Sequence, residues 1–199
     1  MPTLAPGTEV SIRPEALTHL TFPPPKGSVL LVGVHDAALN APESPHTQLL
    51  AFQFGELVWA GALSETALRV ESAAGGDPRA LLGEAVGVGP RIWEVVWPGD
   101  LSLDPGARGG RTTYQGERPW VVIGETTSGD LLAAPLNEAG NTKWYTPEIA
   151  RDEVLMSGSS KDAQLELAHL WSLPGSLPAV GSVSSTARPR VLEAVKKYF

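Results

Sequence analysis

PWVVIGE (residues 119–125) and LLAAPLNE (residues 131–138) are two apolar runs separated by the polar segment TTSGD (residues 126–130). Val and Ile are enriched in the first run, and each run has the length of an ordinary β-strand. A short polar turn can join only strands that run in opposite directions. The stretch therefore predicts an antiparallel hairpin, and this hairpin anchors the interpretation of the rest of the chain.

The N-terminal third has the same character, with short apolar runs separated by Gly, Pro and polar residues. Five strands are predicted, at residues 7–12, 28–35, 49–55, 57–63 and 67–70. Many short strands with glycine at the bends are typical of a small barrel. We expect residues 1–73 to form an SH3-like β-barrel module.

A small-residue stretch separates this module from the rest of the chain. Asp77–Pro78 has the pattern of a helix start, with an acceptor side chain before a proline at the first helical position. Residues 74–93 are therefore predicted to be a helical linker, and residues 94–199 a second barrel. Because the boundary is rich in small residues, the sequence predicts that a C-terminal fragment folds by itself.

Four further segments complete the second half of the chain. Residues 94–104 and 142–149 have strand character, whereas residues 162–171 fit a helix and a strand equally well. The C-terminal segment is predicted to be a helix capped by Ser185 or Thr186. Its apolar residues fall on one helical face: Val191, Leu192, Val195 and Phe199. The predicted fold class is mainly β (β-rich α+β), with two small SH3-like barrels and a C-terminal helix.

Composition restricts the function. The chain has no cysteine, so disulfides, thiolate metal sites and cysteine nucleophiles are excluded. No paired His or carboxylate residues stand at metal-ligand spacing, and we expect neither a metal nor a cofactor. No apolar run approaches the length of a membrane span, which leads us to expect a soluble cytoplasmic protein without a membrane partner.

The charge is uneven along the chain. The net charge is −7, which is unfavourable for general nucleic-acid binding. Residues 1–94 contain 5 basic and 10 acidic residues, whereas residues 95–199 contain 10 and 12. Arg108, Arg111 and Arg118 belong to the less acidic part, on or beside a Gly-rich loop that could form an anion-binding concavity. The alternative is a solvated loop with ordinary surface charges.

Aromatic residues of the second segment offer two interpretations. Trp144 and Tyr145 follow a polar turn, where they could stack on RNA bases. Trp93, Trp97 and Trp120 fall in or next to predicted strands, where tryptophans are more often core or interface anchors.

Three motifs in order resemble the PemK/MazF family of toxins over residues 97–199. They are Gly99–Asp100–Leu101, then Arg118–Pro119 followed by Trp120–Val121–Val122–Ile123, and Ala133–Ala134–Pro135–Leu136–Asn137. The resemblance implies a small barrel that binds single-stranded RNA and cleaves it without a metal, by attack of the 2′-hydroxyl on the neighbouring phosphate. It also implies an antitoxin-like protein partner and a homodimer whose RNA channel crosses the interface. An intramolecular pseudo-dimer, in which the N-terminal module covers that surface, is the alternative.

The resemblance assigns Arg118 to the family's functional arginine, whose planar fork can contact two phosphate oxygens. Asn137 stands where the family usually has a catalytic Thr or Ser. An amide can bind a phosphate oxygen but offers no hydroxyl and no acid–base group near neutral pH. With this departure the sequence still favours RNA binding. Endoribonuclease activity stays open.

A function from another class remains open, in which the chain is a non-catalytic protein–protein interaction module built of two SH3-like barrels. The acidic balance, Asn137 and the apolar strand at Val58–Trp59–Ala60 favour this alternative.

Overall fold

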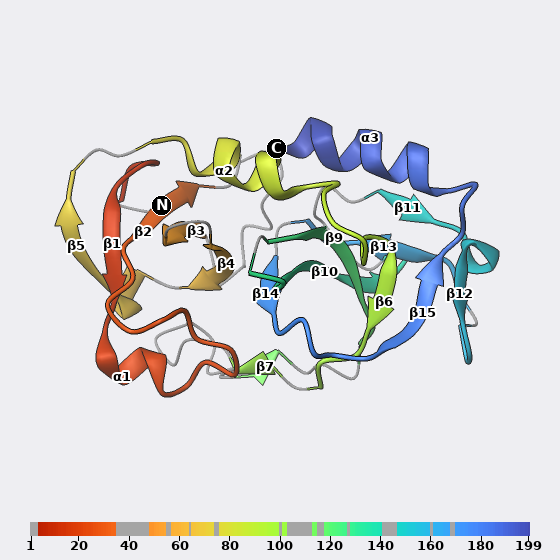
Figure 1. The fold of residues 1–199 in the computed structure, drawn as a ribbon, viewed down its shortest axis with the longest axis horizontal. Helices are drawn as coiled ribbons and strands as arrows, with labels where there is room; N and C mark the ends of the chain where they lie inside the picture. Colours follow the sequence, from red (N-terminus) through yellow and green to blue (C-terminus); the bar gives the residue numbers. More distant parts are fainter. Residues whose placement is uncertain are drawn as a thin grey trace.

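The computed structural model describes residues 4–34, 48–54, 57–63, 65–73, 76–99, 101–102, 113–114, 118–126, 128–140, 147–159, 161–167 and 170–199. Each half of the chain contributes one main antiparallel sheet. The two sheets lie side by side, and helices α2 (Pro78–Ala85) and α3 (Arg188–Tyr198) run along one side of the molecule (Figure 1). The protein is therefore mainly β, with its longest helix at the C-terminus, as the sequence predicted.

The first sheet has five strands in the order β4-β3-β2-β1-β5. Their bounds are β1 (Glu9–Ile12), β2 (Leu30–Val34), β3 (Gln48–Phe54), β4 (Leu57–Leu63) and β5 (Leu68–Ser72). A single turn of helix, α1 (Pro14–Leu17), follows β1, and a 3₁₀ turn, η1 (Glu65–Ala67), precedes β5. All five strands lie where the sequence predicted strands, with shifts of a few residues at their ends.

The second sheet has the order β11-β13-β10-β9-β6-β15-β12, with β14 also paired to β10, and it curls into a nearly closed barrel (Figure 1). Its strands are β6 (Glu94–Val96), β9 (Trp120–Glu125), β10 (Leu131–Glu138), β11 (Glu148–Ile149), β12 (Val154–Met156), β13 (Ala163–Leu165), β14 (Trp171–Leu173) and β15 (Ala179–Val183). A separate two-stranded ladder pairs β7 (Leu101–Ser102) with β8 (Thr113–Tyr114). A 3₁₀ turn, η2 (Arg151–Glu153), precedes β12.

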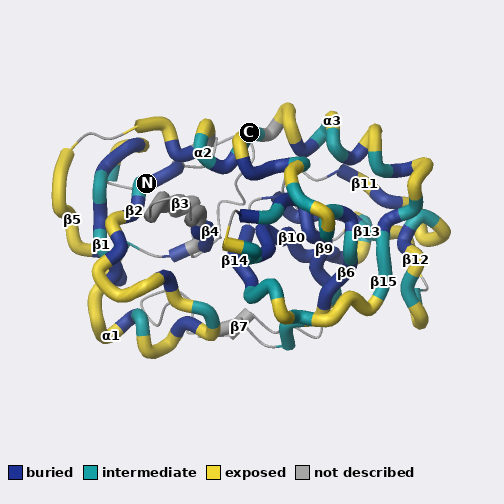
Figure 2. Tube along the Cα trace, viewed as in Figure 1, coloured by how far each residue is buried: buried dark blue, intermediate teal, exposed yellow. Residues whose placement is uncertain are grey.

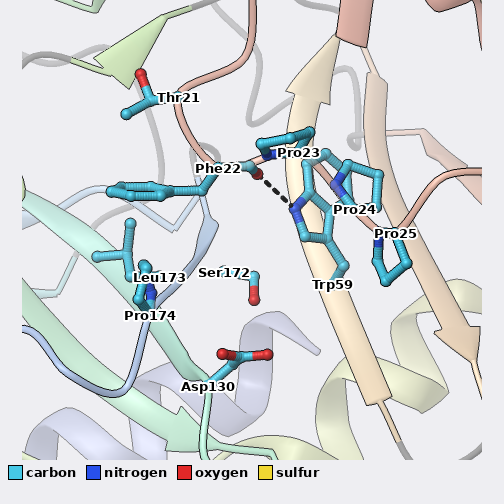
Figure 3. A pocket seen from close by; sticks show the side chains of 10 residues that line it. All are labelled: Thr21, Phe22, Pro23, Pro24, Pro25, Trp59, Asp130, Ser172, Leu173 and Pro174. Carbon is cyan, nitrogen blue, oxygen red and sulfur yellow. Dashed lines mark hydrogen bonds between the residues drawn. The ribbon is translucent and has the colours of Figure 1, made fainter. Parts of the chain in front are cut away.

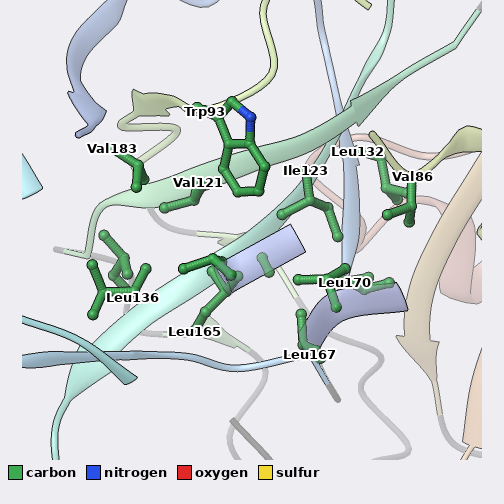
Figure 4. Close-up of a cluster of buried hydrophobic side chains, with 14 of the residues drawn as sticks. Val86, Trp93, Val121, Ile123, Leu132, Leu136, Leu165, Leu167, Leu170 and Val183 are labelled. Carbon is green, nitrogen blue, oxygen red and sulfur yellow. The ribbon is translucent and has the colours of Figure 1, made fainter. Parts of the chain in front are cut away.

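The predicted hairpin is confirmed, because β9 and β10 are adjacent and antiparallel. Both strands are buried on both faces, as the tube in Figure 2 shows by its dark centre. Alternate side chains of the two strands point to opposite faces. One set, Val121, Ile123, Leu132, Ala134 and Leu136, fills the barrel core (Figure 4). Two-sided burial explains why both runs are apolar at nearly every position and lack the alternation of a half-exposed strand.

The other set of side chains joins the two sheets in one apolar cluster. Trp120, Val122, Leu131 and Ala133 meet Trp171 and Leu173 of β14 and residues of the first sheet, among them Val10, Leu30, Val32, Trp59 and Leu63. Trp120 and Trp171 pack edge to face, with ring centroids 6.3 Å apart. Figure 3 shows Trp59 of β4 opposite Ser172 and Leu173 of β14. The halves of the chain thus share a core.

The segment after α2 is bonded to the barrel. Gly87 donates its backbone N–H to the Ile123 carbonyl at 2.8 Å, and the Glu125 N–H donates to the Val88 carbonyl at 2.8 Å. Gly124 has no side chain because a Cβ there would lie 2.2 Å from the Ala85 carbonyl oxygen. Residues 86–88 therefore cover part of the β9 edge and attach the predicted linker to the second sheet.

Helix α3 packs its apolar face against the barrel. One of its arginines, Arg190, also forms hydrogen bonds to residues in or next to the barrel strands. Ala187, Val191 and Val195 are fully buried. Arg190 donates to the Glu148 carbonyl at 2.6 Å and to Glu153 Oε2 at 2.7 Å. The backbone N–H of Ala150, and after it Arg190, hold the pKa of Glu153 below its ordinary value against the opposing effect of burial.

Four further details of the sequence analysis can be compared with the structure. Among the described positions, residues 162–171 contain strand β13 and the first residue of β14, so the strand alternative is correct there. The hydroxyl beneath α3 is that of Ser184, which accepts the Ala187 N–H at 3.4 Å, and neither Ser185 nor Thr186 caps the helix. Of the strand expected over residues 142–149, only β11 lies within the described residues. Trp97 is 42% exposed, so it is not a core anchor, and its role as an interface anchor stays a prediction.

In the part of the chain that the structure describes, no helix has the length and apolarity needed to cross a membrane. The division into residues 1–73, 74–93 and 94–199 stays a prediction. The shared cluster nevertheless bears directly on whether the second barrel can fold alone.

We expect a fragment of residues 76–199 to lose its cooperative unfolding transition. Removing the first sheet would uncover Trp120, Trp171, Leu131 and Leu173, each of which contributes roughly 1.5–3 kcal/mol when buried. That sum is comparable with a whole domain's stability of about 5–15 kcal/mol. Thermal unfolding followed by circular dichroism measures the effect, and adding the fragment of residues 1–75 back should restore the transition. A fragment that melts like the intact chain would show that the barrel folds independently.

Candidate functional site

Three polar side chains from separate elements meet at one end of the β9–β10 hairpin. Arg118, just before β9, donates from Nη1 to Asn137 Oδ1 near the end of β10. Asn137 donates from Nδ2 to Glu166 Oε2, just after β13. We call this chain of hydrogen bonds the Arg118–Asn137–Glu166 relay.

Backbone pairing fixes the three positions. Leu136 donates its N–H to the Pro119 carbonyl at 2.8 Å, which holds the approach to β9 against β10. The Glu166 N–H donates to the Pro135 carbonyl at 2.9 Å, and Asn137 lies opposite Gln164 in the β10–β13 register. The relay therefore depends on a three-strand arrangement and not on one loop.

The relay runs from solvent into the protein. Arg118 is exposed, whereas Asn137 and Glu166 are 6% and 3% exposed. A buried carboxylate needs hydrogen-bond donors, because burial without them costs several kcal/mol. The Asn137 amide supplies one donor and presents its oxygen to the guanidinium, so each end of the amide meets the partner that suits it.

The arrangement can position a cation at the surface. A guanidinium held by a buried amide loses less side-chain freedom on binding an anion than a mobile arginine does. Asn137 has no titratable proton, and Glu166 is too deeply buried for direct contact with a ligand. The geometry thus supports anion binding at Arg118 more directly than proton transfer.

A shallow hollow lies beside the relay. Asn137 lines it together with one basic residue, two acidic residues and six others: Lys161, Glu138, Asp162, Pro119, Leu136, Val154, Met156, Ser159 and Ala163. Lys161 forms an ion pair with Glu138 at the surface. The hollow therefore adds no net positive charge near Asn137, because its one basic side chain is accompanied by two carboxylates.

The structure brings together two of the six predicted site residues, Arg118 and Asn137. The other four, Arg108, Arg111, Trp144 and Tyr145, lie outside the described residues, as does Asp100 of the first motif. The β7–β8 ladder pairs the two ends of the segment that carries Arg108 and Arg111. Trp93 and Trp120 are buried, which confirms the core interpretation for both.

Sequence reasoning missed Glu166. The residue stands in the run Leu165–Glu166–Leu167, and both leucines are fully buried in the barrel core. A charged residue between two core leucines was the available signal. In a strand such a residue points away from its neighbours, towards the face on which Asn137 lies.

No group of three or more potential metal ligands (His, Cys, Asp or Glu) is found within the described positions. Comparison of the chain with protein-family models, curated proteins and solved structures finds no match. The resemblance to the PemK/MazF family therefore remains a prediction that rests on the sequence motifs.

We expect Asn137→Asp to destabilise the protein by about 3 kcal/mol near neutral pH, because it buries a second carboxylate beside Glu166. Like charges raise the pKa of the pair in the folded state. The cost is therefore present above that raised pKa and is relieved as the pH falls through it. Urea unfolding at about pH 7 and about pH 5 measures the difference.

Asn137→Ala is the matched control. It removes the amide without adding charge and should cost about 1–3 kcal/mol. Its change between the two pH values should be smaller than that of Asn137→Asp, because it removes a donor to Glu166 but adds no like charge. If both variants lower the free energy of unfolding by the same amount at both pH values, a carboxylate at position 137 does not repel Glu166 as assumed.

Proposed function

We propose that the protein binds the phosphate backbone of single-stranded RNA through Arg118, as a PemK/MazF-like protein in which Asn137 replaces the family's hydroxyl. The observation that carries the proposal is the relay, because it links an exposed arginine to a buried carboxylate through Asn137. A positioned guanidinium is a strong and geometrically specific phosphate ligand.

The place of the relay supports the proposal. Leu131, Ala133, Pro135 and Asn137 alternate onto one side of β10, and the first two pack in the cluster shared with the first sheet. Asn137, the middle residue of the relay, thus lies on the face of the sheet that packs against the N-terminal half. In the family the RNA channel crosses a dimer interface, and here the junction of the two sheets would take its place, which favours an intramolecular pseudo-dimer.

Charge also supports a nucleic-acid partner for this half of the molecule. The 10 basic residues of the chain after Glu94 nearly balance the 12 acidic ones, whereas the first 94 residues have 5 and 10. Phosphate binding is therefore less opposed at the second barrel than the net charge of −7 suggests.

The chemistry of the relay favours binding over rapid cleavage. Attack by a 2′-hydroxyl requires a group that accepts its proton. Asn137 cannot accept it, and Glu166 is only 3% exposed. We therefore propose an RNA-binding relative of the toxins in which the endoribonuclease step is slow or lost.

The alternative function, protein–protein interaction, loses one of its supports. The apolar strand at Val58–Trp59–Ala60 was expected to offer a docking surface, but Trp59 and Ala60 are 4% and 0% exposed. Their apolar surface is used inside the protein, in the two core clusters.

Arg118→Ala should weaken binding of a single-stranded oligoribonucleotide by about tenfold, the loss expected for one charge-assisted hydrogen bond. The slope of log K against log salt should fall by about 0.7 for each phosphate contact removed. Fluorescence anisotropy of a labelled RNA, measured over a series of salt concentrations, gives both quantities.

Arg69→Ala is the matched control, since Arg69 is an exposed arginine of the first sheet with a side chain 74% accessible. It should leave both the affinity and the slope unchanged. Equal losses for the two variants would indicate general charge attraction and would contradict a specific site at Arg118.

Asn137→Thr should convert the binding protein into one that cleaves RNA measurably. The change restores a hydroxyl beside Arg118 and places it near the Glu166 carboxylate. Gel analysis of a long single-stranded RNA, incubated with each protein in the presence of a chelator, is the assay. Rapid cleavage by the unaltered protein that depends on Arg118 would contradict the idea that Asn137 suppresses the reaction.

A further inference from the structure

A second site lies at the junction of the two sheets, at the far end of β10 from the relay. It is a pocket of about 260 Å³ with walls from both halves of the chain. Figure 3 shows Phe22, Trp59 and Leu173 around it, with Asp130 and Ser172 on one side. Thr21 and the prolines Pro23, Pro24, Pro25 and Pro174 complete the lining.

The aromatic wall of the pocket is fixed in place. Trp59 donates its indole N–H to the Phe22 carbonyl at 3.2 Å. Its six-membered ring lies over Gly61, where a Cβ would come within 2.4 Å of a ring atom. Gly61 thus makes room for an indole that is only 4% exposed, and the half-buried ring of Phe22 supplies the more accessible aromatic surface of the pocket.

Asp130 is the one charged residue among those that line the pocket. Four of the ten lining residues are prolines, which have no N–H, and the Trp59 N–H is engaged by the Phe22 carbonyl. The carbonyls of Pro25 and Pro174 already accept hydrogen bonds from Ser28 and Leu177. Asp130 contributes a carboxylate, and none of the lining residues is Lys, Arg or His. The lining therefore carries negative charge at Asp130 and no positive charge.

Asp130 is held at the rim by its own turn. Its N–H donates to Thr126 Oγ1 at 3.0 Å, and its Oδ2 accepts from the Ser128 hydroxyl at 3.2 Å. No basic side chain pairs with this carboxylate within the described residues. The pocket thus combines apolar walls with a carboxylate at its rim. A cation with an apolar or planar group would match both features.

We propose that this pocket binds the guanidinium group of an arginine side chain from a partner polypeptide. A guanidinium is a cation with five N–H donors and no acceptor, which suits a lining whose one charged residue is Asp130. Its plane stacks on aromatic rings, and its fork fits a carboxylate. The volume lies below the roughly 300–1,000 Å³ of sites for whole small-molecule ligands, so the pocket suits one side chain.

The proposal is independent of RNA binding. Asp130 and Asn137 are seven positions apart along β10 and the turn before it, which corresponds to on the order of 20 Å in a strand. One site offers a cation to an anionic ligand, and the other offers acceptors to a cationic ligand. Failure at either site leaves the other unaffected.

The test is an NMR titration of the full chain, labelled with ¹⁵N, by a blocked Gly-Arg-Gly peptide and by its citrulline counterpart. Citrulline has nearly the same shape as arginine but carries no charge. The arginine peptide should shift the amide signals of Asp130, Ser172 and Phe22, and the citrulline peptide should bind at least about tenfold more weakly. Asp130→Asn should remove most of this preference, whereas Asp152→Asn, at an exposed aspartate of η2, should keep it.

Equal binding of the two peptides would overturn the proposal, as would shifts confined to residues outside the pocket. A free amino acid, arginine, serves as a further arm. If it binds more tightly than the peptide does, a small molecule is the ligand and the assignment to a partner polypeptide is wrong. The comparison of the two peptides uses the unaltered protein, so its outcome does not depend on whether a variant folds.

Discussion

The β9–β10 hairpin has no solvent-facing side over most of its length, and the rest of the fold is arranged around this constraint. One face of the hairpin requires the barrel core, to which buried residues of α2 and α3 also belong. The other face requires the first sheet, because Trp120, Val122, Leu131 and Ala133 would otherwise face water. Two sheets from different halves of the chain are thereby made into one folding unit, although the sequence boundary between them is rich in small residues.

The β9–β10 hairpin also positions both candidate sites. Along one side of β10 the residues change from apolar at Leu131 and Ala133 to polar at Asn137, where the relay to Glu166 begins. The residue before the strand, Asp130, reaches the pocket at the opposite end. A single strand thus carries two groups of opposite electrostatic preference at its two ends, and both depend on how the sheets pack.

Local patterns allowed the hairpin to be predicted, since two apolar runs and a polar turn define it within twenty residues. Glu166 could not be found in this way, because its partner Asn137 lies 29 positions away and the surrounding run fits a helix as well as a strand. The burial of Trp59 was also beyond local reasoning. Whether an apolar strand face is covered depends on what the other half of the chain supplies, in this case Trp171 and Leu173.

The shared core also has a consequence for biosynthesis. The apolar face that contains Trp59 and Leu63 is complete in the nascent chain early, but its partner Leu173 is translated 110 residues after Leu63. At about 5–20 residues per second, the face waits roughly 5–20 s for the strands that cover it. During that interval it is open to chaperones and to other nascent chains, so the yield of folded protein should depend on the rate of translation between the two halves.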